Sequence, residues 1–134
     1  MGKRILLVDE DAGFRRVFTH AMREALGDEG LGVTFVEAGT LAEARTRLRE
    51  GGLDAALIDV TLPDGDGLDL VGEINNGGVG DHIPTLVLTA SLETSVAGRA
   101  MEAGARGALS KLVSMPEAVK AIERLFDAPI EEQR

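Results

Sequence analysis

Near its start the sequence reads Ile5-Leu6-Leu7-Val8-Asp9-Glu10-Asp11, four apolar residues followed at once by three acidic ones. A short, continuous run of Ile, Leu and Val is typical of a strand that is buried on both faces. Similar runs are found at residues 33–37, 55–59, 85–89 and 107–110. Segments with helical periodicity separate them, so the sequence predicts βαβ units around a five-stranded parallel sheet.

Two of the predicted helices have clear start signals. Thr40-Leu41-Ala42-Glu43 and Ser114-Met115-Pro116-Glu117 both match the capping-box pattern. A first helix is expected over about residues 12–26, with an apolar stripe at helical spacing. The stripe consists of Phe14, Val17, Phe18, Ala21, Met22, Ala25 and Leu26. Residues 128–134 include Pro129 and charges but no periodicity, and we expect a tail or the start of a linker there.

Composition narrows the class of protein. A length of 134 residues fits one domain. The net charge of −9 argues against direct nucleic-acid binding, because that binding relies on Lys and Arg. The absence of cysteine excludes disulfides and thiolate chemistry. No apolar run approaches the ~20 residues of a membrane span, so no membrane association is expected and a cytoplasmic location is predicted.

Polar residues that could bind a ligand or react with one lie at the ends of four predicted strands. Residues 9–11 follow the first strand, Asp59 ends the third, Thr89 ends the fourth and Lys111 follows the fifth. Taken singly, each has an ordinary explanation as a helix cap, a turn residue or a surface lysine. The carboxyl ends of parallel strands, however, meet at one edge of the sheet, where α/β domains bind ligands. Carboxylates, a hydroxyl and an ammonium at one edge favour a site for a divalent cation and a phosphoryl group.

The chain resembles the receiver domains of two-component response regulators over residues 3–127. The matching pieces are Ile5-Leu6-Leu7-Val8-Asp9-Glu10, Asp59 with Pro63 and Gly67 at the family's offsets, Thr89-Ala90, and Gly104-Ala105-Arg106-Gly107 leading to Lys111. The resemblance implies a flavodoxin-like, doubly wound α/β fold with strand order 2-1-3-4-5 and helices on both faces.

The resemblance also implies residue roles. Asp59 would accept a phosphoryl group from a sensor histidine kinase, Thr89 would bond that group and Lys111 would pair with it. The implied Mg2+ ligands are Asp9, Glu10, Asp59 and the carbonyl of Thr61. Such a protein is a signalling receiver rather than an enzyme, and it catalyses only its own phosphoryl transfer and hydrolysis. Asp11 has no role in the pattern and is expected to cap the first helix.

The sequence departs from the family at two positions. Leu112 stands where a proline usually follows the lysine, and Ala108 stands where receivers usually have an aromatic switch residue. An aromatic rotamer therefore cannot report phosphorylation here. Residues 109–117 are similar to receivers that precede a LuxR-type helix-turn-helix domain, so we expect either such an output domain or a stand-alone receiver. A homodimer through the first, fourth or fifth helix stays open.

Two alternative functions remain. A non-phosphorylated interaction module with the receiver fold is favoured by Ala108 and Leu112, and the complete acidic and basic set argues against it. A phosphatase of the haloacid-dehalogenase type is suggested by the Asp-x-Asp pattern at residues 9–11. Gly13, however, stands where that superfamily has Thr or Val, and Asp59 would have no purpose.

Overall fold

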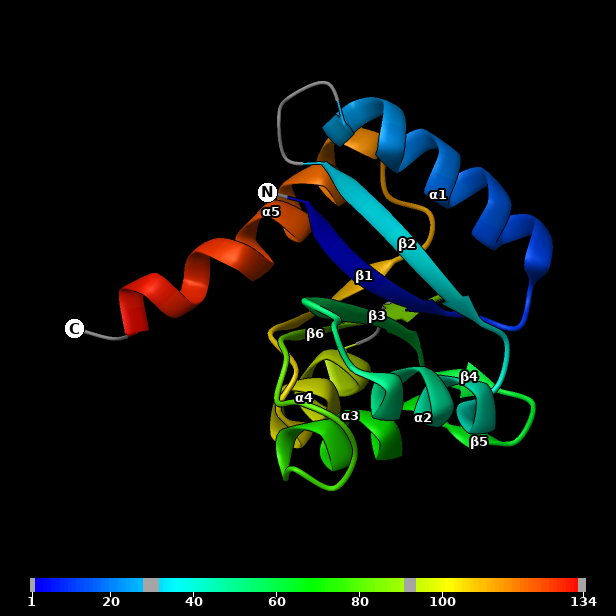
Figure 1. The fold of residues 1–134 in the computed structure, drawn as a ribbon, viewed down its shortest axis with the longest axis vertical. Coiled ribbons are helices and arrows are strands. Elements are labelled where there is room, and N and C mark those ends of the chain that lie inside the picture. The colour runs from blue at the N-terminus through cyan, green and yellow to red at the C-terminus, as the bar shows by residue number, and fades with distance from the viewer. Residues whose placement is uncertain (1, 28–31, 91–93, 133–134) are drawn as a thin grey trace.

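A five-stranded parallel sheet runs through the middle of the molecule (Figure 1). The computed structural model describes residues 2–27, 32–90 and 94–132. The strands of this sheet are β1 Lys3–Val8, β2 Val33–Ala38, β3 Ala55–Asp59, β6 Thr85–Thr89 and β7 Gly107–Ser110. Their order is β2-β1-β3-β6-β7, and all neighbours pair in parallel. The predicted order 2-1-3-4-5 is therefore confirmed.

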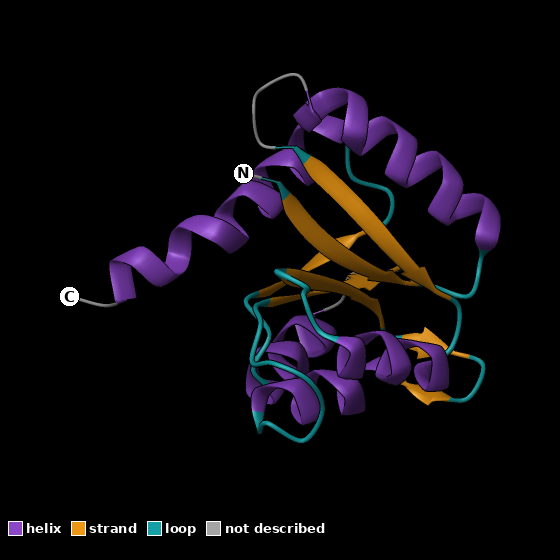
Figure 2. Cartoon of the chain, in the orientation of Figure 1, coloured by secondary structure: helices purple, strands orange, loops and turns teal. Residues whose placement is uncertain are grey.

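Helices cover both faces of this sheet (Figure 2). Within the described ranges they are α1 Ala12–Gly27, α2 Leu41–Glu50, α3 Gly67–Asn75, α4 Thr94–Ala103 and α5 Met115–Glu132. One face carries α1 and α5, and the other carries α2, α3 and α4. None of these helices, as far as they are described, is long and apolar enough for a bilayer crossing.

Two hydrophobic cores lie on the two faces of the sheet. Ile5 and Leu7 pack toward α1 and α5, whereas Leu6 and Val8 pack toward α2, α3 and α4. Successive side chains of a strand point to opposite faces, so an uninterrupted apolar run supplies both cores at once. All four residues are fully buried, which confirms the prediction of a strand covered on both sides.

The apolar stripe of α1 is narrower than predicted. Phe18, Met22 and Leu26 are buried, but Ala25 is exposed and Val17 is 68% exposed. The buried residues follow each other at intervals of four, which defines one narrow line along the helix. On one flank α1 contacts α5, but Val17 borders an open pocket there with Met115 and Ala118, so much of its surface stays exposed.

Helix α5 is longer than predicted. It continues through Pro129 to Glu132, where the sequence shows no apolar periodicity, and its last turns project from the body of the domain (Figure 1). Apolar periodicity reports packing, whereas the hydrogen bonds of a helix are local and do not require a packed face. That residues 128–134 form a tail or the start of a linker stays a prediction.

The loop between β3 and α3 contains a small hairpin that the sequence showed only as a Pro/Gly turn. Strands β4 Thr61–Leu62 and β5 Gly65–Asp66 pair antiparallel. The carboxylate of Asp64 accepts hydrogen bonds from the N–H groups of Leu41 (2.8 Å) and Ala42 (3.1 Å), which fastens the hairpin to the start of α2. These bonds lower the pKa of Asp64.

Gly67 lies against the backbone of Asp59. A Cβ atom added to Gly67 would stand 1.9 Å from the carbonyl oxygen of Asp59. We expect Gly67→Ala to destabilise the protein by about 1–3 kcal/mol, since the backbone itself must move. Gly72→Ala, in the same helix and with no atom within 4 Å of the added Cβ, should instead be neutral or slightly stabilising. Urea unfolding of both variants measures this, and equal stabilities would contradict the close approach.

Candidate functional site

The predicted site residues come together at the carboxyl edge of the sheet. Asp9 directly follows β1, and Asp59 ends β3 opposite Leu88 of β6. Thr89 ends β6 opposite Ser110, so Lys111 follows one residue later. Asp9 is only 1% exposed, and Asp59 and Thr89 are also buried. Among the described residues few polar side chains are buried, and three of them lie at this edge.

The ammonium of Lys111 is shared by two carboxylates. Its Nζ atom lies 2.5 Å from Oδ2 of Asp9 and 3.0 Å from Oδ2 of Asp59. The other oxygen of Asp9 accepts a hydrogen bond from the N–H of Asp11 at 2.9 Å. The other oxygen of Asp59 accepts one from the N–H of Thr61 at 3.1 Å. Each carboxylate is thus held from the backbone on one side and by the same cation on the other.

One cation between two buried acids leaves the charge incompletely balanced. Burial raises the pKa of Asp59, and the hydrogen bonds from Thr61 and Lys111 offset only part of this effect. Partial burial disfavours the charged form of Lys111, but hydrogen bonds to Asp9 and Asp59 outweigh it and raise the pKa of the lysine. Lys111 therefore stays protonated, and Asp59 carries its negative charge at an energetic cost.

This cost predicts a pH-dependent effect of Asp59→Asn. With its pKa raised, the folded state holds the Asp59 proton more tightly than the unfolded chain does. Stability therefore falls as pH rises between the ordinary aspartate pKa and the raised value. In EDTA at neutral pH we expect Asp59→Asn to be more stable than the wild type, and the difference to shrink as pH falls through this window.

Urea unfolding of both proteins across this pH range measures the effect. Asp69→Asn, an exposed carboxylate on α3, is the matched control and should show little difference from the wild type. An Asp59→Asn variant that is less stable than the wild type at neutral pH would contradict the expectation.

The structure does not bring every predicted ligand together. The side chain of Glu10 is exposed, and no group of three His, Cys, Asp or Glu side chains suited to a metal is found in the described ranges. Asp11 caps α1 as expected, since its Oδ1 accepts the N–H of Phe14 at 3.1 Å. The carbonyl of Thr89 accepts the N–H of Lys111 at 2.9 Å. Two of the predicted phosphoryl-binding residues are therefore joined through their main chains.

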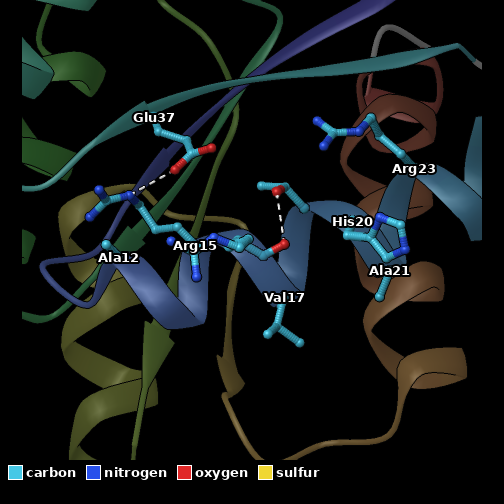
Figure 3. Close-up of a pocket in the computed structure, with 9 residues that line it drawn as sticks. Ala12, Arg15, Val17, His20, Ala21, Arg23 and Glu37 are labelled. Atoms are coloured by element: carbon cyan, nitrogen blue, oxygen red, sulfur yellow. Dashed lines mark hydrogen bonds and ion pairs between the residues drawn. The ribbon is translucent and has the colours of Figure 1, made fainter.

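Two residues near the site were not predicted. The ring of Phe14 lies 4.5 Å below the ammonium of Lys111, a cation–π contact. The guanidinium of Arg15 donates to the main-chain carbonyl of Asp9 and, at 2.9 Å, to Glu37 of β2 (Figure 3). The sequence places both residues in the first turn of α1, but their directions depend on where α1 lies against the sheet.

The sequence matches the response regulator receiver domain family over residues 5–123. The chain belongs to this family. The receiver domain is a signalling domain rather than a classical enzyme. The expected doubly wound, flavodoxin-like sheet is the fold of its structural neighbours, and this explains why the acidic and basic residues meet at one sheet edge.

Relatives of this receiver domain are longer. It is 34% identical over 123 residues to the swarming motility regulation protein RssB of Serratia marcescens, covering 90% of this chain and 52% of RssB. The chain thus spans about half the length of this curated relative. A two-component response regulator of the LuxR family from Aurantimonas sp. SI85-9A1 is similar at 29% identity with a TM-score of 0.78, covering 96% of this chain and 87% of that one. This agrees with the expected similarity to receivers of the LuxR type.

A third neighbour has the same fold at lower identity. It is a response regulator protein from Burkholderia pseudomallei, solved with a phosphorylated aspartic acid, calcium ion and citrate. Its TM-score is 0.68 at 22% identity, and the match covers 97% of this chain and 72% of that one.

Proposed function

We propose that this receiver domain accepts a phosphoryl group from a sensor histidine kinase on Asp59, with the help of Mg2+, and thereby switches a protein-interaction face. The observation that carries the proposal is the buried Asp59 carboxylate, held by Lys111 and by the N–H of Thr61 beside a second buried carboxylate, Asp9. The proposal places the protein in the cytoplasm and assigns it no nucleic-acid binding of its own.

The residues present fit a divalent cation. Asp9 and Asp59 each direct one oxygen toward a shared positive charge, now that of Lys111. Mg2+ needs one or two carboxylates and keeps several waters or phosphate oxygens as its other ligands. Glu10 and the carbonyl of Thr61 are proposed as further ligands. When bound, the ion would neutralise charge on the phosphoryl oxygens. The Burkholderia neighbour, with its phosphorylated aspartic acid and calcium ion, supports this assignment.

In phosphoryl transfer the main task of the protein is to position the reacting groups and the charges around them. An oxygen of Asp59 attacks phosphorus while the phosphorus–nitrogen bond of the donor phosphohistidine breaks. Lys111 offers its ammonium to the transferred group, and Thr89 offers its hydroxyl. Movement of either residue would be passed between the ends of β6 and β7, because the main chains of Thr89 and Lys111 are hydrogen-bonded. Because Ala108 on β7 has no aromatic ring, the proposed switch acts through this backbone connection.

The test of this function is incubation with acetyl phosphate, with and without Mg2+, followed by intact mass measurement. A gain of one phosphoryl group that depends on Mg2+ is expected. No gain from acetyl phosphate or from a histidine kinase would favour the non-phosphorylated interaction module. Size measurement before and after phosphorylation reports any homodimer.

An exposed apolar patch beside the site predicts where the kinase docks. Val17, Leu112 and Met115 are exposed, and Val17 and Met115 line an apolar pocket of about 230 Å3 that also reaches Lys111. Exposed apolar patches of this kind mark interaction sites. We expect Val17→Asp to slow phosphotransfer from the kinase about tenfold, because a charge in an apolar interface opposes docking. The rate from acetyl phosphate should not change.

Met101→Asp is the matched control for this prediction. Met101 is exposed too, but it lies on α4, away from the pocket. Equal slowing by both substitutions, or equal slowing with both phosphoryl donors, would place the docking surface elsewhere.

A further inference from the structure

On the side of α1 that faces β2 lies an open groove of about 690 Å3 (Figure 3). Its charged and titratable lining is Arg15, Arg16, His20 and Arg23 from α1, with Glu37 from β2. This α1–β2 groove shares only Val17 with the apolar pocket beside Lys111, and its charged residues belong neither to the proposed phosphoryl chemistry nor to the kinase-docking patch.

The groove is locally basic in an acidic protein. Three arginines line it against a single carboxylate, although the chain carries a net charge of −9. Glu37 is already paired with Arg15 at 2.9 Å. Glu24, one turn after His20, approaches it at 3.6 Å. Neither Arg16 nor Arg23, both exposed, forms an ion pair with any residue that the structure describes. Two guanidinium groups are therefore available to a ligand.

The spacing of these arginines limits the ligand. Arg16 and Arg23 are seven residues apart on one helix, which corresponds to about 10 Å along its axis. An extended polypeptide covers this distance in about three residues. Exposed Val17 and the alanines Ala12 and Ala21 also line the groove, so it offers apolar contacts between the charges. Side chains an even number of residues apart on an extended segment point the same way, so two glutamates four residues apart would face both guanidinium groups, and the flexible side chains take up the remaining distance.

We propose that the α1–β2 groove is a docking surface for an acidic, extended segment of a partner protein. Guanidinium groups form strong, charge-assisted hydrogen bonds with carboxylates. Such complementarity selects the partner and speeds association. A nucleic acid fits less well, because its continuous negative charge would meet the net negative charge of the rest of the domain.

The probe is a fluorescently labelled peptide of eight residues with two glutamates four residues apart, and its glutamine counterpart is the neutral control. Anisotropy at low salt measures affinity, and amide NMR shifts locate binding. We expect shifts at residues 12–23 and 37, and binding at least about tenfold weaker for the glutamine peptide and at raised ionic strength. Equal binding of both peptides, no binding, or shifts elsewhere would overturn the proposal.

Two double variants distinguish the effect of the groove arginines on peptide binding from the effect of the overall net charge. Arg16→Gln with Arg23→Gln should weaken binding about tenfold. Arg47→Gln with Arg49→Gln, two exposed arginines on α2, changes the net charge equally and should weaken it less than about twofold. Equal weakening by both pairs would reduce the effect to net charge and overturn the proposal. Tighter binding of a twelve-nucleotide oligothymidine at the same residues would overturn it in favour of nucleic acid.

The docking surface does not depend on phosphorylation. The Arg16→Gln/Arg23→Gln variant should gain a phosphoryl group from acetyl phosphate as the wild type does. Wild-type protein that binds the peptide in the groove but takes up no phosphoryl group would support the docking surface and contradict the proposed phosphoryl function alone.

Discussion

Asp59→Asn is expected to gain no phosphoryl group from acetyl phosphate in Mg2+, under conditions in which the wild type gains one. The amide nitrogen and oxygen are poor nucleophiles toward phosphorus. Asp9 shares Lys111 with Asp59 but is more deeply buried, at 1% against 8% exposed, so a phosphoryl donor reaches Asp9 less readily. The loss should therefore be complete within the sensitivity of intact mass measurement.

Asp69→Asn is the matched control, since it removes an exposed carboxylate from α3 and should be labelled like the wild type. Because Asp59→Asn is also expected to be the more stable fold, a loss of labelling in this variant cannot be ascribed to unfolding. Labelling of Asp59→Asn at any other residue, found by peptide mapping, would contradict the assignment of Asp59 as the phosphoryl acceptor.

Lys111→Met is expected to change stability and metal affinity in opposite directions. Without metal, two buried carboxylates lose their shared cation, and we expect a loss of about 2 kcal/mol, between the values for exposed and buried ion pairs. The same ammonium stands where a metal must approach Asp9 and Asp59. Its removal should therefore tighten Mg2+ binding about tenfold, or about 1.4 kcal/mol.

Urea unfolding in EDTA and calorimetric Mg2+ titration measure the two effects. Lys120→Met, which removes an exposed lysine from α5, should change neither quantity appreciably. Weaker Mg2+ binding in Lys111→Met would show that the lysine and the metal do not compete for the two carboxylates. A misfolded variant would lose metal affinity as well, but it would show no cooperative urea transition, so such a transition in Lys111→Met establishes that the metal titration reports on folded protein.

The strands could be predicted closely because burial on both faces leaves a direct mark in the sequence. The runs at residues 55–59, 85–89 and 107–110 became strands with the same bounds. Helix limits that depend on packing were harder to predict. The exposure of Val17 depends on how α1 lies against the sheet and α5, and the extension of α5 to Glu132 depends on local hydrogen bonds that no apolar pattern reveals.

The composition of the site could be predicted, but not the connections within it. Parallel strand ends had to bring Asp9, Asp59, Thr89 and Lys111 to one edge. That one lysine would be shared by both carboxylates depends on side-chain directions. The contacts of Phe14 and Arg15 depend in addition on how α1 lies on the sheet. From the sequence, Gly67 was known only as part of the family pattern. The structure gives the physical reason for a glycine there, because a larger residue would collide with the backbone of Asp59.

The sharing of Lys111 has a consequence for the net charge of the buried pocket. Two carboxylates and one ammonium leave the metal-free pocket with one excess negative charge. A divalent ion alone would reverse it to one excess positive charge. An acyl phosphate replaces the single charge of Asp59 by about two, so the pocket with both ligands would be close to neutral. Buried charge is costly unless it is balanced. On the proposed function, the metal ion and the phosphoryl group would therefore each hold the other in place, and loss of either would loosen both.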